Sequence, residues 1–474
     1  MLPEEKNKRD KAKVILANIF MAVSVVAILG ITFMLTMGYT ITKDLDLAQT
    51  GLVRIGSDPS GATVVIDEGS DQLKTTAKAN LLPGTHTVTV HKSGYTSWKK
   101  NITVRAGGVL WLDYIQLFPL QNTISDVLQV NSSDSYAFSP NAKRFIVLSG
   151  KELGAIDITD ITGSTAKTKQ ASFASILTPF EEVGALQIAS WSDDSSKVLV
   201  KHHFNNQFEW LLLDLERMEK SVNLTNSFQA FFDDVVFGAE NGEVVFTLKN
   251  GALDKIEVYN SIIAHLDENV NVYASYNGRL AYITAEKSAE GEETATLWIY
   301  RTRDARPAKL REVTSQSKLA VSSYRSDDYL AVFDSHTLSI FSGQFQLDDS
   351  GSGLSLLKTI AFNYDVADLS SKHRFFMLRS GNDFLNYDIE TENTKIFNLG
   401  EGEAKAVAWL NDYLFYTNAE RLVVYDFDGD NEQDILAARA GSPAVISPDS
   451  KYLYFMGEDA EGGVWLRQLS LVVK

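Results

Sequence analysis

One short phrase, a polar turn followed by a strongly apolar strand, recurs along most of this chain. It reads SPNAKRFIVLSG at residues 139–150, SDDSSKVLVKH at 192–202 and SPDSKYLYFMG at 447–457. With looser versions included, there are eight copies, at residues 135–150, 188–202, 234–248, 272–284, 320–334, 365–380, 406–418 and 443–457. A short apolar strand precedes each turn, and a third strand usually follows the second. The phrase therefore marks a repeated unit of antiparallel strands.

The spacing of the copies indicates a closed ring of small sheets. Successive copies are about 40 to 50 residues apart, which is the length of a four-stranded β-propeller blade. One such sheet cannot bury both of its faces, whereas blades packed around a ring bury them for each other. We expect an all-β propeller over residues 120–474, with eight blades, or seven if the copy around Asn241 or Asn277 is misread. The last copy lacks a fourth strand, so ISDVLQV at 124–130 is expected to complete it.

The last two copies also resemble known propeller families. The stretch LVVYDFDGDNEQDILAARAGSPAVISPDSKYLYFMG, at residues 422–457, is similar to TolB-like and WD-repeat-like propellers. This resemblance implies a fold and leaves the function open, because propellers serve many functions.

An uncharged apolar segment near the N-terminus predicts a membrane anchor. Residues 14–37 carry no charge over 24 residues, so a helix would reach about 36 Å and could cross a hydrocarbon core of about 30 Å. The run is too long for the apolar core of a signal peptide. Residues 1–13 hold five basic and three acidic residues, a net charge of +2, which places them in the cytoplasm by the positive-inside rule. We expect the rest of the chain outside the cell membrane, after a linker at 38–50.

Dense strand signals over residues 51–119 predict a small β-sandwich next to this anchor. In THTVTVHK, Val88 and Val90 share one face of a strand, as a half-buried antiparallel strand requires. The series PSGA at 59–62, VVID at 64–67 and LLPGTHTVTVHKSGY at 81–95 resembles the PEGA domain. After Asp67 the chain departs from that family, which usually has a glycine turn and Thr-Pro. The resemblance implies an extracytoplasmic binding or spacer module.

Composition excludes several classes of function. The chain has no cysteine, so disulfides, zinc–thiolate sites and cysteine nucleophiles are excluded. The net charge is −17, and removing the +2 of residues 1–13 leaves about −19 for the remainder. An acidic body of this kind does not favour nucleic acid, which requires clustered Lys and Arg.

Two charged stretches are candidate binding sites. DFDGDNEQD places Asp426, Asp428, Asp430 and Asp434 at positions 1, 3, 5 and 9 of a turn, which suits calcium and its oxygen ligands. The alternative is an ordinary hairpin turn, since Ala437 stands where a calcium loop has Glu. The basic run RTRDARPAKLR at 301–311 could bind an anionic partner or could be an exposed connection between blades.

No catalytic motif accompanies these candidates. The seven histidines include no His-x-x-x-His pair, and neither a Gly-x-Ser-x-Gly elbow nor a glycine-rich phosphate loop occurs. We therefore expect a membrane-anchored extracytoplasmic binding or scaffold protein whose propeller engages a protein or a cell-envelope glycan, with no cofactor beyond a possible calcium ion. The alternative is a propeller-based glycan hydrolase or lyase with an acidic site in the central channel.

Overall fold

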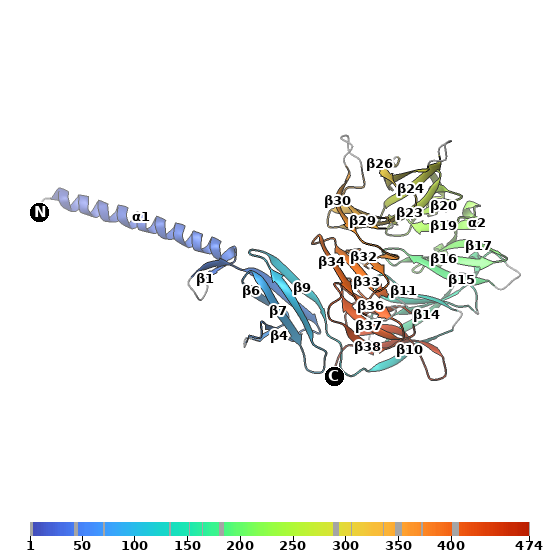
Figure 1. The fold of residues 1–474 in the computed structure, drawn as a ribbon, viewed down its shortest axis with the longest axis horizontal. Helices are drawn as coiled ribbons and strands as arrows, with labels where there is room; N and C mark the ends of the chain where they lie inside the picture. The colour runs from blue at the N-terminus through green and yellow to red at the C-terminus, as the bar shows by residue number, and fades with distance from the viewer. Residues whose placement is uncertain are drawn as a thin grey trace. The chain divides into compact units, whose positions relative to one another are not determined.

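The computed structural model of the chain describes residues 3–41, 46–69, 72–131, 134–150, 152–163, 165–179, 184–287, 293–304, 306–334, 336–346, 353–370, 373–400 and 407–473. It divides into two compact units. The first comprises residues 1–121 and 473–474, and the second comprises residues 122–472. Figure 1 shows the helix and sandwich of the first unit in blue and the sheets of the second from cyan to red.

The N-terminal segment forms one long helix, α1 (Pro3–Thr36). Its stretch Lys13–Thr36 is long and apolar enough to cross a membrane, and no other part of the described chain buries it. Phe20 is 75% exposed, as expected for a side chain that would face lipid. Ser24 donates its hydroxyl hydrogen to the Phe20 carbonyl at 2.8 Å, so this polar group is satisfied within the helix. The helix begins well before residue 14, within the segment that we expected to be a cytoplasmic tail.

The segment expected to be a linker, 38–50, contains a short hairpin. Strand β1 (Tyr39–Ile41) pairs with β2 (Leu47–Gln49) in antiparallel register. Residues 42–45 of that linker lie outside the described chain.

The rest of the first unit is a sandwich of two sheets. In one, β3 (Gly51–Asp58) lies between β6 (Ala77–Leu81) and β9 (Val109–Gln116). The other has the order β5 (Leu73–Lys74), β4 (Thr63–Ile66), β7 (Gly84–His91) and β8 (Trp98–Val104). Val88 and Val90 are fully buried, with Trp98, in the apolar core between the sheets. The alternation predicted for this strand is confirmed.

The described residues of the second unit form eight four-stranded sheets, one for each copy of the repeated phrase. We number them 1 to 8 in chain order. Their first strands are β11 (Ser135–Phe138), β15 (Ala185–Trp191), β19 (Asp234–Phe237), β23 (Val270–Tyr276), β27 (Lys318–Tyr324), β31 (Val366–Leu369), β35 (Val407–Trp409) and β39 (Ala444–Ile446). The second strands are β12 (Arg144–Leu148), β16 (Lys197–Phe204), β20 (Val244–Lys249), β24 (Arg279–Lys287), β28 (Asp327–Asp334), β32 (Phe375–Ser380), β36 (Leu414–Asn418) and β40 (Tyr452–Glu458).

The third strands are β13 (Ala155–Asp160), β17 (Gln207–Asp214), β21 (Ala252–Glu257), β25 (Glu293–Arg301), β29 (Thr337–Gly343), β33 (Asp383–Asp388), β37 (Arg421–Asp426) and β41 (Val464–Ser470). The fourth strands are β14 (Lys167–Ser172), β18 (Val222–Asn223), β22 (Ile262–Asp267), β26 (Ala308–Val313), β30 (Leu354–Ala361), β34 (Asn393–Asn398), β38 (Gln433–Ala437) and, for sheet 8, β10 (Ile124–Val130). A short helix, α2 (Leu224–Phe228), follows β18.

Apolar clusters between neighbouring sheets bury the faces that a single sheet would expose. Ile146 of sheet 1 packs in one cluster with Val198 and Leu211 of sheet 2. Sheets 8 and 1 share another, which contains Tyr454 and Phe145. The fold of this unit is therefore a β-propeller, as predicted.

The earliest strand of the unit closes the ring. β10 pairs with the last strand, β41, from Ile124 opposite Leu469 to Val130 opposite Val464. Just before β10, Asn122 donates its side-chain N–H to the Ile435 carbonyl of sheet 7 at 2.7 Å. Figure 1 shows cyan β10 beside red β38 accordingly. Strand 124–130 completes the last sheet, as the sequence predicts.

The repeated turn has a local physical cause. The hydroxyl of Ser139 accepts hydrogen bonds from the backbone N–H groups of Lys143 and Arg144. Ser447 does the same for the N–H of Tyr452 at 3.0 Å, and it donates to Asp449 at 2.8 Å. A serine at this position satisfies backbone donors that the turn leaves without a strand partner. The serine of the repeated turn therefore has a structural role.

Candidate binding surface at one end of the propeller

All copies of the repeated turn lie at the same end of the propeller. Neighbouring strands in each sheet are antiparallel, so the turn between strands one and two and the turn between strands three and four emerge together. We call this the repeat-turn end. The opposite end carries the turns between strands two and three and the connections from one sheet to the next.

Turns from sheets that are not neighbours meet near the axis at the repeat-turn end. The ring of Tyr276, from sheet 4, stacks on His373, from sheet 6, with centroids 3.8 Å apart. Asp193, from sheet 2, accepts a hydrogen bond from the backbone N–H of Asn277, in sheet 4. Such contacts skip a sheet, which is possible only where the sheets converge. We call Asp193, Glu240, Tyr276 and His373 the axial cluster.

The axial cluster has unusual acid–base properties. Partial removal from water, opposed by the Asn277 hydrogen bond and reinforced by the charges of Glu240 and Asp194, raises the pKa of Asp193 to about 6. Burial lowers the pKa of His373, so its uncharged form is favoured. The cluster therefore joins a carboxyl group that titrates near neutrality to a neutral imidazole.

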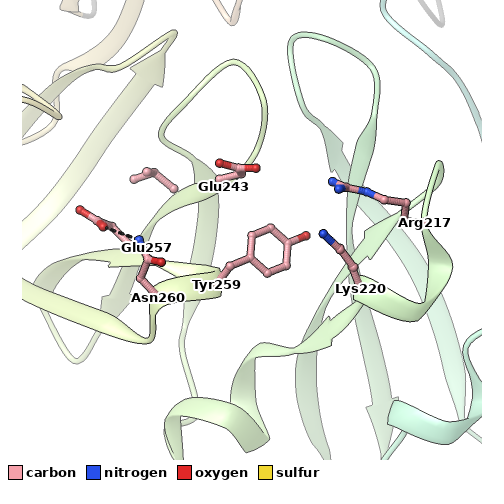
Figure 2. Close-up of a pocket in the computed structure, with 7 residues that line it drawn as sticks. Arg217, Lys220, Glu243, Glu257, Tyr259 and Asn260 are labelled. Carbon is pink, nitrogen blue, oxygen red and sulfur yellow. Dashed lines mark hydrogen bonds between the residues drawn. The ribbon is translucent and has the colours of Figure 1, made fainter.

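A hollow of about 280 Å³ lies farther from the axis, between sheets 2 and 3. Figure 2 shows its two sides: Arg217 and Lys220 come from one sheet, and Glu243, Glu257 and Asn260 from the other, with the ring of Tyr259 between them. We call it the charged hollow. The cationic side follows strand β17 and the anionic side adjoins β20 and β21, so only the packing of two sheets brings the charges together.

Hydrogen bonds from neighbouring residues position the charged side chains of this hollow. Arg217 donates to the buried carboxylate of Asp214 at 3.2 Å. Hydrogen bonds from Asn260 and Lys255 lower the pKa of Glu257, which therefore stays ionised. Partial burial, with the nearby charge of Asp214, raises the pKa of Tyr259 to about 12, so its hydroxyl stays neutral. The hollow thus presents cations, anions and a neutral phenol to a ligand.

The four carboxylates predicted to bind calcium are spread over a third-to-fourth-strand turn of sheet 7. Asp434 lies on β38 and pairs with Arg421 at 2.7 Å, while Asp426 accepts a hydrogen bond from Asn431. Gly429 supplies the left-handed backbone of the turn, with φ of +82°. Over the part of the chain that the structure describes, no group of three or more His, Asp or Glu residues is placed to hold a metal ion. Calcium binding by Asp426, Asp428, Asp430 and Asp434 stays a prediction.

The adjacent residues His202 and His203 point to opposite faces of strand β16. His203 is exposed, whereas His202 is fully buried and its Nδ1 lies 2.9 Å from Glu209. Glu209 also accepts hydrogen bonds from Thr178 and Asn223. This buried network is structural.

The basic run 301–311 is divided by the fold. Arg301 ends β25, Arg303 lies in the turn that follows, and Arg311 lies on the outer strand β26. The first two line a second hollow at the repeat-turn end, together with Arg279 from β24.

Sequence reasoning missed the charged hollow because its residues form no local motif. Arg217 and Lys220 are three positions apart in a turn that looks ordinary, and Glu257 ends a strand 37 residues later. The one available signal was position: both groups flank a turn between third and fourth strands in adjacent repeats. Such turns meet at one end of any propeller.

Comparison with known proteins identifies one region of the chain. Residues 50–117 match the family model of the PEGA domain. No curated protein matches the chain. Among solved structures, it is similar to an oligogalacturonate lyase in complex with manganese, at 12% identity and a TM-score of 0.40 over 73% of this chain and 98% of that one.

Two further solved structures show a similar degree of likeness. The Dos1 propeller has 12% identity and a TM-score of 0.44, covering 73% of this chain and 96% of that one. Porphyromonas gingivalis dipeptidyl peptidase 4 has 10% identity and a TM-score of 0.46, covering 71% of this chain and 58% of that one.

Proposed function

We propose that this chain is a membrane-anchored binding protein that displays its propeller outside the cytoplasm and engages a protein or a cell-envelope glycan at the repeat-turn end. The apolar stretch Lys13–Thr36 serves as the anchor. The PEGA domain serves as the extracytoplasmic spacer that its family resemblance implies. Five basic residues before the anchor favour a cytoplasmic N-terminus.

The charged hollow is the observation that carries the binding proposal. Its volume of about 280 Å³ is at the lower end of ligand pockets, so it suits one side chain or one sugar of a larger partner. Cations on one wall and anions on the other favour a partner group that bears both charges. Tyr259 offers a flat apolar ring with a polar tip between them, a residue type enriched where proteins bind partners. A polypeptide or a glycan with amino and carboxylate groups has this chemistry.

Site-specific photo-crosslinking in cells tests this proposal. We would replace Tyr259 with p-benzoylphenylalanine in the full-length protein and, as a matched control, replace Phe231. Phe231 is also an exposed aromatic residue, at 55% exposure, but it lies in the connection between sheets 2 and 3, at the opposite end. We expect a discrete adduct from position 259 and none from position 231. Adducts only at position 231 would contradict the assignment of the binding end.

The axial cluster favours a second candidate, a glycan hydrolase or lyase. A carboxyl group with a pKa of about 6 beside Glu240 has the properties of a general acid. Hydrolysis by a carboxylate pair would require Asp193 and Glu240 to flank a bound sugar about 5 to 10 Å apart. If full-length protein cleaves anionic or amino glycans and Asp193→Asn abolishes the cleavage, the enzyme is favoured. Binding without cleavage favours the scaffold.

A further inference from the structure

The second hollow at the repeat-turn end is lined by arginines. It has a volume of about 200 Å³ and is formed by Asn277, Gly278, Arg279, Arg301, Thr302 and Arg303. Three of these six residues are arginines and none is acidic. The chain has a net charge of −17, so this lining is a local concentration of positive charge in an acidic protein. We call this the arginine hollow.

Two of the three arginines face each other across a strand pair. Arg279, at the start of β24, is the direct partner of Arg301, at the end of β25. Like charges at directly opposed positions destabilise a sheet. The fold therefore places two guanidinium-bearing side chains at the same edge of the sheet.

Only Arg279 is neutralised by the protein. Its Nε donates to Asp328 at 2.7 Å, and Asp328 is 1% exposed. The other oxygen of Asp328 accepts from the Phe345 N–H at 2.9 Å. The Asp328 carboxylate thus points toward the interior, where it holds the guanidinium group of Arg279 in place.

The side chains of the other two arginines form no ion pair with any residue that the structure describes. Arg301 donates its Nη1 hydrogen to the neutral amide oxygen of Gln346 at 3.1 Å. Within the described ranges, the side chain of Arg303 has neither a hydrogen bond nor an ion pair. Asp304 lies in the same turn, where its carboxylate accepts from the backbone N–H of Arg301 at 3.2 Å. The charge of Arg303 opposes the rise that burial causes in the pKa of Asp304, so this carboxylate balances part of the positive charge. Lys255 also lies nearby, because its Nζ donates to the Thr302 carbonyl at 3.2 Å, but it is paired with Glu257 at 3.3 Å.

The backbone keeps the hollow open. Gly278 has φ of +79°, and a Cβ at this position would lie 3.1 Å from the hydroxyl oxygen of Thr302. Glycine therefore leaves the turn close to the strand that carries Arg301 without filling the space between them.

We infer that the arginine hollow is an oxyanion site, which binds a phosphate or carboxylate group through the guanidinium groups of Arg301 and Arg303 beside the fixed Arg279. The planar guanidinium presents paired N–H donors that match the paired oxygens of such groups. The inference does not depend on the proposed function, because it concerns a different hollow and can be tested on the isolated protein.

The test uses full-length protein in detergent and four sodium salts at equal ionic strength: phosphate, sulfate, acetate and chloride. We expect phosphate or acetate to raise the unfolding temperature more than chloride does. Stabilisation by sulfate as well as by phosphate would identify tetrahedral anions, and not carboxylates, as the preferred class of ligand. Titration calorimetry with phosphate should show affinity reduced at least tenfold in the double variant Arg301→Gln/Arg303→Gln, which retains the pairing of Arg279 with Asp328.

A charge-matched variant, Lys169→Gln/Lys395→Gln, removes two exposed cations from other sheets and should retain wild-type affinity. Without added anion, Arg301→Gln should be at least as stable as the wild type, because the Arg301 side chain forms no ion pair with a described residue and lies opposite another arginine. A purely structural arginine would predict the reverse. The inference is overturned if chloride stabilises the wild type as well as the oxyanions do. It is also overturned if the folded double variant binds phosphate as the wild type does. If the double variant does not fold, Arg303→Gln alone takes its place in this comparison.

Discussion

The hydrogen bonds of single residues explain why the repeated phrase contains serine and aspartate at fixed positions. In sheet 2, Ser192 accepts the backbone N–H of Lys197 at 2.9 Å and donates to Asp194 at 2.7 Å. The same serine-to-aspartate pattern occurs at Ser447 and Asp449. The aspartate that directly follows the serine in sheet 2, Asp193, takes no part in this bonding and faces the axis. One turn therefore combines a structural serine with an exposed carboxyl group that does not bond to it.

The two aspartates of this turn should respond to pH in opposite directions. The folded pKa of Asp193, about 6, is above the usual 3.8, so folding favours its protonated form and stability is lost as the pH rises from about 4 to 6. Asp193→Asn should therefore be more stable than the wild type above pH 6, by about 1 kcal/mol or less because the carboxyl group is partly open to solvent. Thermal unfolding of the full-length protein at pH 4, 6 and 8 measures this difference.

Asp194 is the matched control. Burial opposes its ionisation, but hydrogen bonds from Ser192 and Ser196 lower its pKa. Its stabilising contribution should be present above pH 4 and lost in more acidic solution, so Asp194→Asn should be less stable than the wild type at pH 8. If both variants shift in the same direction, the electrostatic description of the axial cluster is wrong.

The same residues mark the limit of prediction from sequence. The serine phrase was recognisable because its hydrogen bonds are local and recur. The pairing of Tyr276 with His373, or of Arg279 with the basic run, depends on which turns converge in space. No local pattern encodes that convergence.

At the scale of elements, closure of the ring depends on β10. This strand is separated from its partner β41 by more than 330 residues, and Arg467 donates to Asp126 at 2.8 Å across the pair. A fourth strand was missing from the last repeat, and the only unassigned strand signal stood before the first. These two observations were enough to predict that β10 pairs with β41.

A buried charge in β10 tests its register. Val130 is 2% exposed and packs in the cluster between sheets 8 and 1, so Val130→Asp should destabilise the propeller by about 3 kcal/mol or more. Ile124, in the same strand, is 43% exposed, and Ile124→Asp should cost less than about 1 kcal/mol. Urea unfolding followed by circular dichroism compares them. Equal losses would mean that β10 does not seal the ring in this register.

Other element boundaries were harder to predict. Hydropathy marks where a helix can enter a membrane, and it does not mark where the helix begins. Residues 4–13, rich in Glu and Lys, are good helix formers, so α1 starts near residue 3. The small hairpin of β1 and β2 is too short to leave a periodic signal.

For the whole molecule, the order of apolar helix, PEGA domain and propeller was predictable because each part has its own sequence pattern. The helix has an uncharged run, the sandwich has alternating strands, and the propeller has a repeat. The candidate binding surface was not predictable to the same degree. The charged hollow joins Lys220 to Glu257, and the arginine hollow joins Arg279 to Arg303, through contacts that exist only once the sheets are packed.

Membrane topology is the premise on which the proposed function depends. Because the chain has no cysteine, single-cysteine variants report position without background. We would label intact cells with a membrane-impermeant maleimide, using Lys8→Cys for the N-terminal segment, Lys78→Cys for the sandwich and Lys249→Cys for the propeller. The account predicts labelling at positions 78 and 249, and at position 8 only after the cells are permeabilised. Labelling at position 8 alone in intact cells would contradict it.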